Sequence, residues 1–120
     1  MKTRFAFALL AIAMLCTLAG AQENTSGYWI ERAEELSQNS SFVEASNAYE
    51  KALQIEPDNA TIWHSLGFEL ITIGKENEST RALEKALSLL NESLAKNPQD
   101  ADLWNQKGLV LMSLGRPNEC

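Results

Sequence analysis

The chain has 120 residues, enough for one small domain, and it contains only three Pro and six Gly. This composition suits a helical globular or repeat domain and argues against collagen-like or disordered structure. The formal net charge is −6, and it becomes about −8 without residues 1–21, which hold two basic and no acidic residues; the positive surface that nucleic-acid binding requires is therefore missing.

The first 21 residues have the organisation of a secretory signal peptide. Lys2 and Arg4 supply the positive start, an apolar run covers residues 5–18, and three small residues end at Ala21. The run is shorter than the roughly 20 residues that span a bilayer. We expect cleavage after Ala21, a short linker over residues 22–25 and a secreted or extracytoplasmic mature protein. An uncleaved N-terminal segment that anchors the protein in a membrane is the alternative.

Five Asn-x-Ser/Thr sequons occur among the nine Asn of the chain. They begin at Asn24, Asn39, Asn59, Asn77 and Asn91. Each is a potential glycan acceptor if the protein follows a secretory route. The alternative is that Asn and Ser co-occur because both favour turns.

The residue types needed for catalysis or metal binding are scarce. Cys16 lies inside the apolar leader and Cys120 is the last residue, so no cysteine pair remains after export. The single histidine, His64, lacks the partners of a metal site or a catalytic triad. We expect no enzymatic activity, no metal and no cofactor.

A tryptophan recurs along the chain at a spacing typical of helical repeats. Trp29 and Trp63 are 34 residues apart, and Trp104 follows 41 residues later. The first unit carries Trp29, Ala33, Leu36, Ala45, Tyr49, Ala52 and Pro57, the second Trp63, Leu66, Gly67 and Leu70, and the third Trp104, Gly108 and Leu111. This pattern resembles the tetratricopeptide repeat (TPR) family, with departures at Arg32 and Lys107, where Leu is usual.

The resemblance implies an all-α fold, a right-handed superhelical solenoid of antiparallel helix hairpins with about two and a half TPR units. The units would cover residues 26–59, 60–100 and an incomplete 101–120. The family implies a protein–protein interaction module that binds a protein or peptide. A membrane-anchored structural or assembly subunit at the cell surface, or a fragment of a longer TPR protein, is the alternative.

Glycines and prolines mark the expected ends of the helices. Gly74 and Gly115 stand where the first helix of a unit ends, because Gly accepts the left-handed cap conformation, and Asn39 is assigned the same role in the first unit. Pro57 and Pro98 break the chain between hairpins, since Pro does not continue a helix.

Small residues are expected where the two helices of a hairpin approach closely. Ala33, Gly67 and Gly108 occupy the matching positions of the three units. The tryptophans fill the space between successive hairpins.

The second unit is seven residues longer than the first. No Pro or Gly occurs from Glu76 to Lys96, and apolar residues recur there at helical spacing. Seven residues are nearly two helical turns, so the insertion preserves the buried face. We expect one helix of roughly 20 residues that overhangs its neighbours.

The resemblance places the binding surface on the concave face, which is lined by the first helix of each unit. The residues assigned to it are Ile30, Glu34, Gln38, His64, Phe68, Ile71, Thr72, Asn105, Leu109 and Met112. This mixed surface with an apolar strip suits an amphipathic or extended peptide. It lacks the basic cluster with which some members hold a carboxylate.

The last helix is unusually apolar. Besides Trp104, six large apolar residues occur from position 103 to position 114, more than one preceding hairpin can bury. A solenoid needs a polar outer face on its final helix. The apolar end predicts self-association through the C-terminal helix, contact with a partner, or continuation in a longer array.

Overall fold

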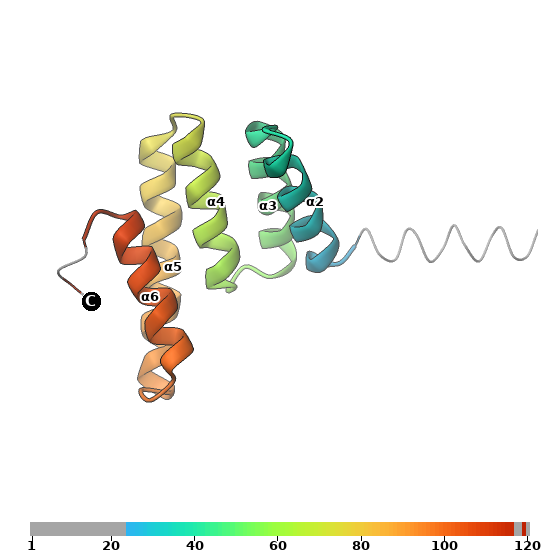
Figure 1. The fold of residues 1–120 in the computed structure, drawn as a ribbon. Helices are drawn as coiled ribbons and strands as arrows, with labels where there is room; N and C mark the ends of the chain where they lie inside the picture. Colours follow the sequence, from blue (N-terminus) through green and yellow to red (C-terminus); the bar gives the residue numbers. More distant parts are fainter. Residues whose placement is uncertain (1–23, 117–118, 120) are drawn as a thin grey trace, which may run out of the picture.

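The computed structural model describes residues 24–116 and 119, and these residues form five helices and no strand. The helices are α2 (Ser26–Gln38), α3 (Phe42–Ile55), α4 (Ala60–Thr72), α5 (Glu76–Lys96) and α6 (Ala101–Ser113). Each helix packs against the next one along the chain, and α2–α3 and α4–α5 form two antiparallel hairpins (Figure 1). The expected all-α fold is confirmed.

The predicted signal peptide and its cleavage site lie outside the described residues, as does Cys120. Within the described part of the chain, no helix combines the length and the apolar character needed to cross a membrane.

The apolar core consists of two clusters. The first lies where α2, α3 and α4 meet and includes Ala52 and Leu66; the second lies between α5 and α6 and includes Leu90 and Val110. The Trp63 side chain packs against both clusters and so joins them. Burial of a leucine of this kind contributes about 1.5 to 3 kcal/mol.

Gly67 allows α4 and α5 to approach as the sequence predicts. A Cβ atom at Gly67 would lie 2.7 Å from the Leu83 side chain, closer than such atoms come in proteins. At the same contact, the Ser79 hydroxyl donates a hydrogen bond of 2.6 Å to the Gly67 carbonyl. A side chain at position 67 would therefore push the hairpin apart. Gly108 is only partly buried, and no second helix of its unit occurs among the described residues.

Gly74 and Gly115 end α4 and α6 in the left-handed conformation, with φ of +83° and +71°. At Gly74, the N–H of Lys75 donates to the Leu70 carbonyl at 2.9 Å, and an equivalent hydrogen bond follows Gly115. These bonds occupy carbonyls that the end of a helix leaves free.

The assignment of Asn39 to the corresponding left-handed position was wrong. Asn39 has φ of −87°, and the following residue, Ser40, has φ of +60°. The N–H of Ser41 donates to the Leu36 carbonyl, completing the same motif. Ser40 is also the residue that stands one 34-residue period before Gly74, so register outweighs the general preference of Asn for this conformation.

The sequence-based expectation of one long helix in the second unit is confirmed. α5 has 21 residues, against 14 in α3. It continues past the start of α4, and α6 lies along this overhanging part (Figure 1).

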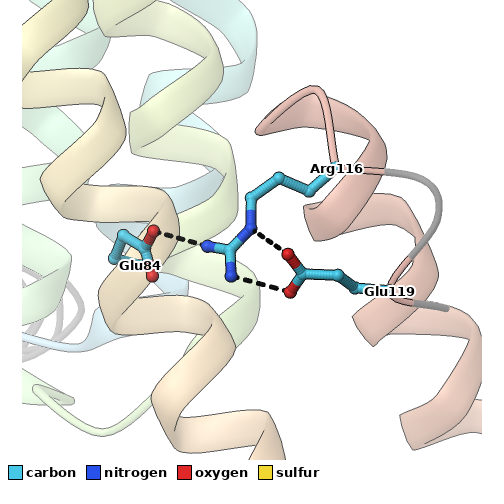
Figure 2. A network of polar contacts seen from close by, with 3 residues as sticks. All are labelled: Glu84, Arg116 and Glu119. Carbon is cyan, nitrogen blue, oxygen red and sulfur yellow. Dashed lines mark hydrogen bonds and ion pairs between the residues drawn. The ribbon is translucent and has the colours of Figure 1, made fainter.

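The chain beyond α6 turns back toward α5. Arg116 Nη1 donates to Glu84 on α5 at 2.8 Å, and Nε and Nη2 donate to Glu119 at 2.8 and 2.7 Å (Figure 2). Hydrogen bonding to Glu119 raises the pKa of Arg116, and the same contact lowers the pKa of Glu119. Exposed ion pairs contribute modestly to stability, so the network chiefly sets the direction of this segment.

The cap at Ser40 generates a stability prediction. Ser40→Gly removes the strain of a left-handed serine, which stabilises the fold, and adds conformational freedom to the unfolded chain, which destabilises the fold. Because the strain is the larger effect, we expect the free energy of unfolding to rise by about 0.5 to 1 kcal/mol. Gly74→Ala makes the reverse change at the equivalent position, because it places a side chain in the left-handed conformation. It should lower the free energy of unfolding by about 1 kcal/mol. Urea denaturation followed by circular dichroism measures both. A Ser40→Gly variant less stable than the wild type would contradict this account of the cap.

Candidate partner-binding site

Four exposed apolar side chains gather on α4 and α6. Phe68 and Ile71 on α4 are 60% and 48% exposed, and Leu109 and Met112 on α6 are 50% and 65% exposed. They make up four of the seven large hydrophobic residues that are exposed in the described part of the chain. These four residues are called the apolar strip below. All four belong to the first helices of their units, where sequence analysis places the binding surface.

The helix α6 meets α4 out of step with the sequence repeat. His64 Nε2 lies 3.1 Å from the Ser113 hydroxyl, although its equivalent in the third unit is Asn105. Closer to the start of both helices, the Thr61 hydroxyl donates to Gln106 at 3.4 Å. The seven extra residues of α5 account for this offset, because they move the start of α6 by roughly 10 Å along α5.

One consequence is that Leu109 lies beside His64 instead of beside its own equivalent, Phe68. His64 and Leu109 line the same small cavity of about 120 Å³ between α4 and α6. The members of the apolar strip on α4 and α6 therefore do not pair as the sequence repeat would align them. The repeat alignment identified its members but not this arrangement.

His64 lies between α4 and α6 and is half-buried there. Burial lowers its pKa from the ordinary value. The Ser113 hydroxyl donates its proton to the Leu109 carbonyl at 3.1 Å, which assigns the donor role in the contact with Ser113 to Nε2 of His64. His64 therefore acts here as a hydrogen-bonding bridge between helices. Among the residues the structure describes, no group of three or more His, Cys, Asp or Glu is placed to hold a metal ion.

The other residues assigned to the concave face differ in burial. Glu34, Gln38, Thr72 and Asn105 are exposed. Ile30 is half-buried and packs against the first core cluster, so much of its side chain is engaged in the fold.

The Asn side chains of four of the five sequons are exposed, although Ser79 of the Asn77 sequon is buried. Asn24, Asn39, Asn77 and Asn91 are exposed. Asn59 is half-buried and caps α4: its side-chain oxygen accepts from two backbone N–H groups, and its amide donates to Glu56 at 3.0 Å. A glycan at Asn59 would compete with this contact.

Glu69 is a buried carboxylate that was not predicted. Its side chain is on α4, the residue is 3% exposed, and its Oε2 atom has no hydrogen-bond partner among the described residues. Sequence does contain a signal for its burial, because Glu69 follows Ile62 and Leu66 at helical spacing.

Glu69 belongs to a polar cluster around the phenol of Tyr49. Burial raises the pKa of Tyr49, and a hydrogen bond with Ser65 lowers it in part. The negative charges of Glu34 and Glu69 raise it further. These groups come from α2, α3 and α4, so a polar contact lies at the junction of the first two units.

Burying a carboxylate oxygen without a partner costs free energy. Glu69→Met keeps a side chain of similar length and removes the charge, so we expect it to raise the free energy of unfolding by about 1 to 2 kcal/mol. Glu44→Met, at an exposed position on α3, is the control and should change stability by less than about 0.5 kcal/mol. If Glu69→Met destabilises the protein in urea denaturation, the Glu69 carboxylate has hydrogen-bond partners in solution and this account fails.

Comparisons with known proteins agree with the repeat pattern. Residues 33–70 match a family model described as TPR repeat, and residues 60–89 match one described as tetratricopeptide repeat. A comparison with curated proteins found no significant match. TPR domains are non-catalytic folds that generally bind protein or peptide partners. The segment from residue 33 to residue 89 is thus similar to tetratricopeptide repeats, and the five described helices pack in sequence as the helix pairs of that fold do.

Proposed function

We propose that this protein is an exported interaction module that binds an apolar segment of a partner protein or peptide on the apolar strip. The observation that carries the proposal is the exposure of Phe68, Ile71, Leu109 and Met112 on neighbouring first helices. Grouped apolar side chains at a protein surface typically mark an interaction site.

The chemistry of the strip suits an amphipathic or extended peptide. Phe68 offers a flat aromatic face, and Met112 has an unbranched, polarizable side chain that adapts to different shapes. Thr72 and Asn105 supply exposed polar groups on the same helices. Burial of one such apolar side chain by a partner contributes about 1.5 to 3 kcal/mol.

Removing an apolar side chain from the strip tests this function. We expect Phe68→Ala and Leu109→Ala each to weaken capture of the native ligand from an extract of the source cells by about 5- to 30-fold, the loss of 1 to 2 kcal/mol of contact. Helicity by circular dichroism should not change, because both side chains are exposed. Val43→Ala, which alters a 54% exposed residue on α3, is the matched control. Capture at the wild-type level by both strip variants would exclude the strip as the binding surface.

Export is supported by the organisation of the first 21 residues and by the sequons. The charged start, the apolar run and the small residues before position 22 are typical of a cleaved leader. The Asn residues of four sequons are exposed on the folded chain. A membrane-anchored assembly subunit is the second candidate, and it requires that the leader be retained.

The intact mass of the protein isolated from its source separates these two candidates. We expect the loss of residues 1–21, together with added mass that an N-glycosidase removes. A retained leader would favour the membrane-anchored subunit and would contradict the soluble exported module.

A further inference from the structure

The overhang of α5 creates a second concave surface, separate from the apolar strip. An open groove of about 480 Å³ lies between the loop that precedes α4, the second half of α5 and the first half of α6. We call it the step groove. The residues that define it are Glu56, Asp58, Leu89, Leu90, Leu103 and Gln106.

Three leucine side chains contribute to the interior of the step groove, beside the polar residues of its walls. Leu89 and Leu90 reach it from α5, and Leu103 reaches it from α6. Leu89 and Leu90 are anchored in the fold, being 8% and 2% exposed, whereas Leu103 is half-buried. Together they offer a fixed apolar seat for one side chain of a ligand.

The loop that forms one wall is held in place by side-chain hydrogen bonds. Trp63 Nε1 donates to the Pro57 carbonyl at 2.7 Å. The Asn59 side chain caps α4 and donates to Glu56. The Thr61 hydroxyl on α4 also donates a hydrogen bond to the side chain of Gln106 on α6. A groove held in this way requires little ordering when a ligand binds, which favours affinity.

The mouth of the step groove is acidic. Glu56 and Asp58 both line it, and no Lys, Arg or His residue does. Neither carboxylate takes part in an ion pair among the described residues. A ligand with a positive charge beside its apolar group would complement this lining.

The step groove also leads toward the apolar strip. It shares Ala60, Thr61, Leu90 and Gln106 with the small cavity that reaches Leu109. The step groove thus adjoins the cavity beside Leu109, one member of the apolar strip.

We propose that the step groove binds an extended segment of a partner protein, with a leucine-sized side chain seated on Leu89, Leu90 and Leu103 and a neighbouring Lys or Arg beside Glu56 and Asp58. This inference rests on the proposed function of the chain as an interaction module. It adds the chemistry of the partner and uses residues that the apolar strip does not include.

The probe for this site is the peptide acetyl-GGKLKGG-amide, titrated into the ¹⁵N-labelled full chain. We expect chemical-shift changes at the backbone amides of Asp58, Leu89, Leu103 and Gln106. Two control peptides carry Glu in place of Lys or Ser in place of Leu. Both should bind at least about fivefold more weakly, because the first loses the positive charge and the second loses the apolar side chain. Equal responses to all three peptides, or no response at millimolar peptide, would overturn the proposal.

The charge of the groove is tested by the double variant Glu56→Gln and Asp58→Asn. We expect about fivefold weaker binding of the lysine peptide, from the loss of two exposed ion pairs. The matched control is Glu31→Gln with Glu44→Gln, which removes the same charge from exposed positions on α2 and α3. If both double variants bind the peptide with the same affinity, only the net charge of the protein attracts it and the site is wrong.

The geometry of the groove is tested by deleting residues 91–97. The deletion restores the 34-residue spacing between Trp63 and the next tryptophan, and it removes the overhang on which the groove depends. We expect peptide binding to fall at least tenfold. Circular dichroism checks that the shortened chain folds, and the charge variants decide the question if it does not.

Comparing capture of the native ligand with peptide binding separates failure of the step groove from failure of the proposed function. If Phe68→Ala abolishes capture while the charge variants and the deletion leave both capture and peptide binding unchanged, the strip functions and the step groove does not. If Phe68→Ala and Leu109→Ala have no effect on capture, the proposed function itself fails, whatever the peptide does.

Discussion

The fold depends on the fact that neither of the two described hairpins can bury its own apolar face. The α2–α3 and α4–α5 hairpins each leave apolar side chains that only the next helix covers. Trp63 connects the two resulting clusters, and its indole N–H also fixes the loop between the units through Pro57. The same residue thus couples packing between units to the path of the chain, as a repeat architecture requires.

Trp104 shows the same interaction at the end of the described array. Its indole N–H donates to the Pro98 carbonyl at 2.8 Å, repeating the bond made by Trp63. Its ring, however, is half exposed, because no further helix in the described part of the chain covers it. The hydrogen bond from the indole to the loop therefore does not depend on burial of the ring. At Trp104 this bond is kept, whereas the packing between units is only partly present.

Much of the fold could be predicted from sequence, because the relevant signals are local. The spacing of apolar residues, together with Pro57 and Gly74, was enough to predict the helices and the length of α5. The left-handed position was assigned to Asn39 instead of Ser40, because residue preference was given more weight than the repeat register. The side-chain contacts between α4 and α6 depend on how separate units meet, which no local pattern contains. The burial of Glu69 was missed although its spacing from Ile62 and Leu66 places it on the buried face, because a carboxylate is not expected there. For the candidate site, sequence supplied the members of the apolar strip but not the step groove, which exists only because three separate segments meet.

The insertion in α5 also shows how a helical repeat can change shape without losing its packing. Seven residues turn a helix through about two full turns, so the side chains after the insertion face the same way as those before it. The second helix of a unit can in this way act as a spacer of variable length. Insertions of about two turns change where the next unit sits along its neighbour, whereas an insertion of five residues would rotate the apolar face toward solvent. Variation in helix length would then be a route by which related proteins acquire different recognition surfaces from one set of core contacts.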